Sequence, residues 1–101
     1  MTGRLQDKVA LISGAGTGIG AAAAQLFAAQ GARVMVCGRR REPLEAVVAQ
    51  IRAQGGVADW VQADVTDEAS VDNTVAVTVE RFGQLDVMIN NAVNYTWGML
   101  S

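Results

Sequence analysis

The chain contains no histidine, one lysine and one cysteine among its 101 residues. Without histidine, and with only one thiol, it lacks the ligand sets by which proteins usually hold zinc or other transition metals, so no metal-binding residue is expected. Cys37 cannot form a disulfide within the chain, and its place in an apolar run favours a buried, unreactive thiol. This cysteine usage is typical of a protein from a reducing, cytoplasmic compartment.

Long apolar runs and clusters of positive charge are also scarce. No apolar stretch approaches the roughly 18 residues that a membrane-spanning helix needs. Eight basic and ten acidic residues leave a net charge of −2. The one basic cluster, at 39–41, is too small for a nucleic-acid-binding surface. We therefore expect neither a membrane nor a nucleic acid as a partner.

Half of the residues are hydrophobic although only 5% are aromatic, and the apolar residues form short runs rich in alanine and valine. Strands are expected at 8–13, 33–37, 57–63 and 86–90. Helical periods separate them at 18–30, from Pro43 to the glycines at 55–56, and from the N-cap Thr66 to Gly83. This order predicts an α/β fold of the form β-α-β-α-β-α-β, a three-layer Rossmann-type half in which helices cover both faces of a parallel sheet.

Each predicted helix has one face that is expected to turn toward the sheet, because its apolar residues recur at helical spacing. In chain order, the three faces consist of Ile19, Ala23, Leu26 and Phe27; of Leu44, Val47, Val48 and Ile51; and of Val71, Val75, Val79 and Phe82.

A glycine-rich loop at 14–20 joins the first strand to the first helix, with glycine at every second position. Glycine lets the backbone turn sharply and approach a ligand, and the helix start presents N–H groups to an anion. A Walker-type loop requires lysine and then serine or threonine after its last glycine, whereas four alanines follow Gly20. A Gly-x-Gly-x-x-Gly/Ala pattern fits from Gly16, several residues past the strand; Gly-x-x-x-Gly-x-Gly from Gly14 suits the turn better.

Residues 13–20, Ser-Gly-Ala-Gly-Thr-Gly-Ile-Gly, resemble the cofactor loop of the short-chain dehydrogenase/reductase family, with Ser13 in place of the usual threonine. Three further features match in order: Gly38-Arg39, Asp64-Val65, and the run Leu-Asp-Val-Met-Ile-Asn-Asn-Ala at 85–92. The resemblance is to the N-terminal, cofactor-binding half of that family. It implies a partial NAD(P)-binding Rossmann-type domain at 1–92, and we expect the tail at 93–101 to be poorly ordered.

The resemblance also implies the residues of a dinucleotide site. They are Gly14, Gly16, Thr17, Gly18, Ile19, Gly20, Arg39, Asp64, Val65, Asn91 and Ala92. An acidic residue at the end of the second strand would favour NAD, but Gly38 stands there, and the guanidinium of Arg39 can pair with a 2′-phosphate. NADP is therefore expected as the cofactor, ahead of NAD. The alternative for Arg39 is a solvated basic turn, and for Asp64 a turn or capping aspartate before Thr66.

Catalytic residues are not expected in this chain. The resemblance implies that hydride transfer needs a serine, a helix asparagine and a Tyr-x-x-x-Lys pair, all carried by the family's second half. Here the only tyrosine, Tyr95, is followed four residues later by Met99, and Lys8 is the only lysine. The expected function is the NADP(H)-binding portion of a truncated short-chain oxidoreductase. Two alternatives stay open: a non-catalytic nucleotide-binding module that pairs with another chain, and a non-functional gene fragment.

The fourth predicted strand, at 86–90, carries an expectation about association. In the full fold that the resemblance implies, further strands would lie beside it. An apolar strand with unpaired backbone groups is prone to pair with another chain. We therefore expect self-association through this exposed edge.

Overall fold

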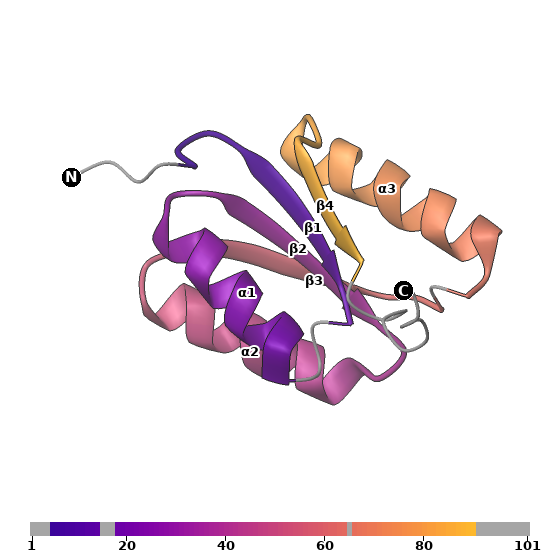
Figure 1. Cartoon of the computed structure of the whole chain (residues 1–101), viewed down its shortest axis with the longest axis horizontal. Coiled ribbons are helices and arrows are strands. Elements are labelled where there is room, and N and C mark those ends of the chain that lie inside the picture. Colours follow the sequence, from indigo (N-terminus) through magenta and orange to yellow (C-terminus); the bar gives the residue numbers. More distant parts are fainter. Residues whose placement is uncertain (1–4, 15–17, 65, 91–101) are drawn as a thin grey trace, which may run out of the picture.

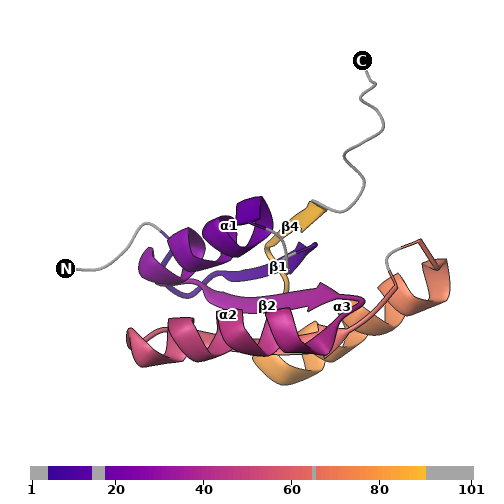
Figure 2. The same ribbon diagram turned by 90° about the horizontal axis from the view of Figure 1, so that it is seen from below.

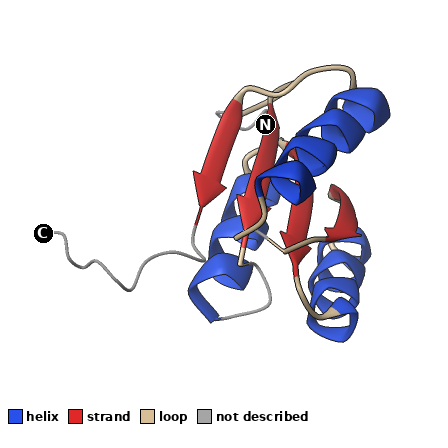
Figure 3. Ribbon diagram, turned by 90° about the vertical axis from the view of Figure 1, so that its right-hand side faces the viewer, coloured by secondary structure: helices blue, strands red, loops and turns tan. Residues whose placement is uncertain are grey.

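Three helices alternate with four strands in the computed structural model, which describes residues 5–14, 18–64 and 66–90. The elements are β1 (Val9–Ser13), α1 (Gly18–Ala29), β2 (Arg33–Gly38), α2 (Arg41–Ala53), β3 (Val57–Gln62), α3 (Glu68–Phe82) and β4 (Val87–Asn90). All strand pairs are parallel, in the order β3-β2-β1-β4 (Figure 3). The predicted α/β architecture is thus confirmed.

β1 is one of the two inner strands of the four-stranded sheet. All five of its residues are buried, and it hydrogen-bonds β2 on one side and β4 on the other. Val9 lies opposite Arg33 of β2, and Ala10 lies opposite Val87 of β4. A strand buried on both faces of a parallel sheet reads as a continuous apolar run, which is why β1 was recognisable in the sequence.

Helices cover both faces of the sheet, α1 and α2 on one and α3 on the other (Figure 1, Figure 2). Successive side chains of a strand point to opposite faces, so Ile12 packs in the cluster under α1 and α2 while Leu11 packs in the cluster under α3. The first cluster is the larger of the two and contains Leu44 and Ile51 of α2. The main core therefore lies between the sheet and the α1–α2 layer.

The inward face of α2 is confirmed. Its four buried residues are those that the spacing predicted: Leu44, Val47, Val48 and Ile51. The helix begins at Arg41, which places Pro43 in the first turn, where its missing N–H is not needed. Gly56 follows the helix and packs against it, so that a Cβ at this position would lie only 2.7 Å from Cγ2 of Ile51. The turn after α2 thus depends on a glycine for space.

The predicted inward face of α1 is partly wrong. Ile19 is 75% exposed and Leu26 is 59% exposed, whereas the buried residues of the helix are Gly20 and Ala24. Phe27 and Ala23 pack against the core as expected. Small residues let the helix backbone approach the sheet closely, so the contacting face is set by what fits rather than by the largest apolar side chains.

The predicted inward face and start of α3 also need correction. The fully buried residues are Thr74 and Thr78, while Val79 is 42% exposed. Val75 and Phe82 pack against the core as expected. Each buried hydroxyl donates to a carbonyl one turn earlier in the helix, Thr74 to Ser70 at 2.8 Å and Thr78 to Thr74 at 2.7 Å. With its hydroxyl satisfied in this way, a threonine packs much as a valine does.

The N-cap of α3 is Asp67 instead of Thr66, because the Asp67 carboxylate accepts from the N–H of Ala69 at 3.1 Å. The helix ends as predicted at Gly83, which has φ of 87°. This left-handed conformation is easily adopted by glycine and rarely by other residues.

Asp59 of β3 joins the helices on the two faces of the sheet. Its carboxylate pairs with Arg52 of α2 at 3.9 Å and with Arg81 of α3. Arg52 also donates to the carbonyl of Ala58 at 3.1 Å. The side chain of Asp59 is only 18% exposed, so this carboxylate is partly shielded from water at the edge of the sheet. Charges on both sides of β3 thereby hold the edge strand against its neighbouring helices.

Asp86 ties the beginning of β4 to the beginning of β1. Its carboxylate accepts from the N–H of Val9 at 2.9 Å and from the side-chain amide of Gln84 at 2.6 Å, and its own N–H donates to the Val9 carbonyl at 2.9 Å. The Val9 N–H, followed by the Gln84 amide, lowers the pKa of this carboxyl below its ordinary value.

This lowered pKa predicts an acid-dependent contribution to stability. A carboxyl whose pKa is depressed in the folded state stabilises it above the unfolded pKa, and that stabilisation is lost as pH falls through the folded pKa. Asp86→Asn is therefore expected to lower the melting temperature at pH 7 and to lower it much less at about pH 2.5. Thermal unfolding followed by circular dichroism at the two pH values measures both differences.

The matched control for this prediction is Asp72→Asn, the same substitution at an exposed residue of α3. We expect this variant to change the melting temperature little at either pH. An Asp86→Asn penalty of equal size at both pH values would contradict the assigned role of the charge.

Candidate dinucleotide site

The carboxyl ends of the four parallel strands form the edge at which the candidate site lies. The chain passes from β1 to β2 to β3 on one side of β1 and then returns to place β4 on its other side. In such open sheets, ligands bind outside the carboxyl ends of the strands, where the strand order reverses. Here this switch point lies between β1 and β4.

The glycine loop begins at this switch point. Gly14 directly follows β1, has φ of 70°, and donates its N–H to the Cys37 carbonyl at 3.0 Å. The helix α1 starts at Gly18, and a Cβ built there would have nothing within 4 Å. The loop therefore turns through a glycine conformation at one end and leaves open space at the helix start. Such a helix terminus, with its N–H groups directed outward, suits the phosphates of a ligand.

The other two glycine-loop residues that the structure describes lie in contrasting places. Gly20 is buried against the sheet side of α1, which gives it a packing role. Ile19 is 75% exposed at the same helix start, so its side chain is available to a ligand and contributes little to the core.

Ser13 and Asn90 close the switch point from the strand side. The Ser13 hydroxyl donates to Oδ1 of Asn90 at 2.8 Å, and it lies 3.4 Å from the Ile89 carbonyl. These contacts connect the last residue of β1 to the last residue of β4 across the parallel pair. Asn90 thereby ties the end of β4 to the end of β1.

Arg39 lies immediately after β2, where the backbone bends away from the sheet. Its Nε is 3.7 Å from Oδ1 of Asp64, and the side chains of the two residues are 70% and 50% exposed. The preceding residue, Gly38, has room for a side chain, since a Cβ there would lie at an ordinary 3.6 Å from Leu44. A Cβ would therefore fit at Gly38, and no acidic side chain stands at this strand end.

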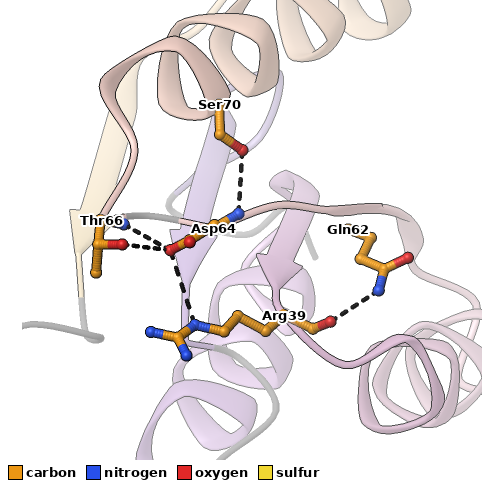
Figure 4. A network of polar contacts seen from close by, with 5 residues as sticks. All are labelled: Arg39, Gln62, Asp64, Thr66 and Ser70. Carbon is orange, nitrogen blue, oxygen red and sulfur yellow. Dashed lines mark hydrogen bonds and ion pairs between the residues drawn. The ribbon is translucent and has the colours of Figure 1, made fainter.

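Asp64 follows β3 and is held by the turn that leads into α3 (Figure 4). Its Oδ1 accepts from the hydroxyl of Thr66 at 2.6 Å and from the N–H of Thr66 at 3.0 Å, and its own N–H donates to the hydroxyl of Ser70 at 3.0 Å. The Thr66 hydroxyl, then its N–H, and to a smaller extent the charge of Arg39, lower the pKa of Asp64. The carboxylate is thus negatively charged at neutral pH.

A shallow hollow of about 250 Å³ lies between the ends of β2 and β3. It is lined by Arg39, Gln62, Ala63, Asp64 and Ser70. Gln62 lines it, and its side-chain amide donates to the Arg39 carbonyl at 2.8 Å (Figure 4). The sequence reasoning singled out Arg39 and Asp64 but neither Gln62 nor Ser70. The register that places Gln62 opposite Gly38 would have indicated Gln62, and it becomes visible only in the folded sheet.

The structure thus places the expected residues in two groups at one edge of the sheet. Gly14, Gly18, Ile19 and Gly20 surround the β1–α1 turn, while Arg39 and Asp64 form the pair beside the hollow. Five further expected residues lie outside the described part of the chain: Gly16, Thr17, Val65, Asn91 and Ala92.

Residues that could carry other chemistry are few in the described part of the chain. Cys37 is buried at the end of β2, and burial raises the pKa of its thiol to about 11, so the thiol is neutral and unreactive at physiological pH. Across residues 5–14, 18–64 and 66–90, no three Cys, His, Asp or Glu residues gather as a metal site would require. No helix in these ranges has the length and apolar character needed to cross a membrane.

Comparison with known proteins agrees with this geometry. A family model described as short chain dehydrogenase matches residues 8–99. The chain belongs to the short-chain dehydrogenase family. Among characterised members, the 2,5-dichloro-2,5-cyclohexadiene-1,4-diol dehydrogenase LinX of Sphingobium indicum is 48% identical over 92 residues, which are 91% of this chain and 37% of LinX.

Solved structures of short-chain dehydrogenases superpose closely on the fold. A hydroxysteroid dehydrogenase from Escherichia coli matches 86% of this chain with a TM-score of 0.84 and 34% identity, and the match covers 37% of that enzyme. A metagenomic short-chain oxidoreductase, solved in complex with NADP, matches 83% of this chain with a TM-score of 0.79 and 34% identity, over 38% of its own length. The chain therefore spans little more than a third of the length of these relatives.

Proposed function

We propose that this chain forms the dinucleotide-binding part of a short-chain oxidoreductase and that it binds NADP(H) in preference to NAD(H). The observation that carries the proposal is the exposed guanidinium of Arg39 directly after β2, where Gly38 ends the strand without an acidic side chain. A carboxylate at this strand end would hydrogen-bond the ribose hydroxyls and repel a 2′-phosphate, whereas a guanidinium attracts it. The NADP complex of the metagenomic relative supports the same choice.

The residues present fit such a cofactor. The left-handed Gly14 and the open space at Gly18 leave a cradle at the start of α1 that a larger side chain at Gly18 would begin to fill. We assign the pyrophosphate to this cradle, together with Gly16, Thr17, Ile19 and the buried Gly20, and the adenosine end to the hollow beside Arg39.

Asp64 and Val65 are proposed to face the adenine, and Asn91 and Ala92 the ribose on the nicotinamide side. Oδ1 of Asp64 accepts both hydrogen bonds from Thr66, so the carboxylate holds the turn that shapes the hollow whatever else it contacts. The proposal therefore gives Asp64 both roles that the sequence left open, that of a turn aspartate before Thr66 and that of an adenine contact.

When bound, the cofactor supplies the hydride, and these residues bind and orient it. The Tyr-x-x-x-Lys pair that the family resemblance implies for proton transfer is not present in the 101 residues, because Lys8 is the only lysine. We propose that oxidoreductase activity requires catalytic groups from outside this sequence. The substrate of that reaction is decided by those groups and their surroundings.

Direct titration of the purified chain tests the proposal. We expect NADPH to bind at least about 10-fold more tightly than NADH, because one charge-assisted hydrogen bond to the 2′-phosphate contributes about 1.5–3 kcal/mol. The enhancement of nicotinamide fluorescence on binding measures both affinities. Equal affinities would contradict the NADP preference, and binding of neither cofactor at millimolar concentration would contradict the whole proposal.

Two other expectations stay predictions. β4 hydrogen-bonds β1 along one side, and Met88 on it is 46% exposed, which is compatible with the self-association expected through this edge. The cytoplasmic location expected from the single cysteine is likewise a prediction.

A further inference from the structure

We infer that Gln62 is a positioning residue for Arg39 and thereby helps to determine the preference for NADP(H). The inference rests on the proposed function, because it concerns how the cation that would meet the 2′-phosphate is held in place. Gln62 is the last residue of β3 and belongs to none of the motifs that carry the family resemblance.

The hydrogen bonds at the ends of β2 and β3 show what Gln62 does. The ladder between the two strands ends at the pair Gly38 and Gln62, and the N–H of Ala63 donates to the Gly38 carbonyl at 2.8 Å. The next carbonyl along the chain, that of Arg39, lies beyond the ladder and accepts from the Gln62 side chain, also at 2.8 Å. The side chain of Gln62 therefore extends the pairing of the two strands by one residue.

This extension matters because little else in the described part of the chain fixes Arg39. Its side chain is 70% exposed, and its ion pair with Asp64 spans 3.7 Å between two exposed groups, a kind of contact that water and salt weaken strongly. A long arginine side chain has many rotamers, so where its guanidinium lies depends first on where its backbone is held. The Gln62 hydrogen bond acts on that backbone at the bend between β2 and α2 (Figure 4).

Asp64 and Gln62 divide the positioning of Arg39 between them. Asp64 attracts the guanidinium toward β3, and Asp64 is itself held by Thr66 and Ser70. Gln62, the last residue of β3, holds the Arg39 carbonyl through its side-chain hydrogen bond. Both the backbone and the guanidinium of Arg39 are thus held by residues at the end of β3. This arrangement places the cation at the rim of the hollow before a ligand binds.

The test is Gln62→Met in the 101-residue chain, with affinities for NADPH and NADH measured by nicotinamide fluorescence. Methionine has nearly the same length and no charge, but it cannot donate to the Arg39 carbonyl. We expect NADPH binding to weaken about 3- to 10-fold and NADH binding to change less than about 2-fold, since the loss corresponds to one hydrogen bond made through Arg39.

The matched control is Gln84→Met. Gln84 also donates its side-chain amide to a backbone carbonyl, that of Asp7 at 2.9 Å, but it lies at the opposite end of the strands, before β4. The thermal melting temperatures of the two variants show whether either has lost its fold. We expect Gln84→Met to leave both cofactor affinities unchanged, so that an effect confined to Gln62→Met and NADPH belongs to the site.

A double-mutant cycle with Arg39→Ala separates positioning from general support of the strand ends. If Gln62 acts through Arg39, Gln62→Met has no further effect on NADPH binding once the guanidinium is gone. A full additional loss in the Arg39→Ala background, or equal losses for NADPH and NADH, would overturn the inference. If the wild-type chain itself shows no preference for NADPH, the proposed function fails, and the role of Gln62 fails with it.

Discussion

Arg39→Asp is expected to weaken NADPH binding about 100-fold, since it removes a charge-assisted hydrogen bond and places a like charge beside the 2′-phosphate. NADH binding should strengthen in the same variant, because the new carboxylate can accept hydrogen bonds from the adenosine ribose at the end of β2. The side chain of Arg39 is 70% exposed, so the substitution reverses a surface charge and leaves the core intact. Fluorescence titration with both cofactors measures the change in preference.

The matched control for Arg39→Asp is Arg40→Asp, the same change of charge one residue further along. Arg40 is the N-cap of α2 and its side chain makes no capping hydrogen bond, whereas aspartate is a favourable N-cap residue, so the control should fold at least as well as the wild type. We expect its NADPH affinity to fall less than about 5-fold, because a screened charge without direct contact has a small effect. Equal losses in the two variants would refute a specific contact at Arg39.

Ile12→Ala is expected to lower the free energy of unfolding by about 2–5 kcal/mol, the cost of emptying a fully buried isoleucine site. Ile12 is 0% exposed on the inner strand β1 and packs in the cluster that α1 and α2 cover. Since a chain of this size has a total stability of about 5–15 kcal/mol, this single change removes a large share of it. Urea unfolding followed by circular dichroism measures the difference.

Ile19→Ala provides the same chemical change at the start of α1, where the side chain is 75% exposed. Alanine is the better helix former, and little buried surface is lost, so the free energy of unfolding should change by less than about 0.5 kcal/mol. Comparable destabilisation by the two variants would mean that Ile19 packs against the core, as the apolar spacing alone suggested.

The order and types of the elements were predictable because buried parallel strands and amphipathic helices leave different periods in the sequence. The inward face of α2 was predictable for the same reason, since it is built from large aliphatic residues. The faces of α1 and α3 were predictable only in part, because their most deeply buried residues are Gly20, Ala24, Thr74 and Thr78. Close packing rewards small or self-satisfied side chains at such contacts, and a hydrophobicity pattern does not register them.

The candidate site shows the same division between what motifs predict and what the register adds. Arg39 and Asp64 were identified because Gly38-Arg39 and Asp64-Val65 match features that the family resemblance places at the ends of two strands. That the two would pair at 3.7 Å, with the Gln62 side chain fixing the Arg39 backbone, depends on the alignment of β2 with β3. Nothing local to Gln62 in the sequence distinguishes it from the other exposed glutamines.

The strand order β3-β2-β1-β4 also has a consequence for the way the chain folds. One helix, α1, connects β1 to its neighbour β2. In contrast, three helices and two strands separate β1 from its other neighbour β4, where Ala10 pairs with Val87. Closing this roughly threefold longer loop costs about 1 kcal/mol more in chain entropy, and contacts between distant residues slow folding. We therefore expect the first three strands to assemble as the nucleus, with β4 joining last, so the switch point for the ligand is completed only in the final step of folding.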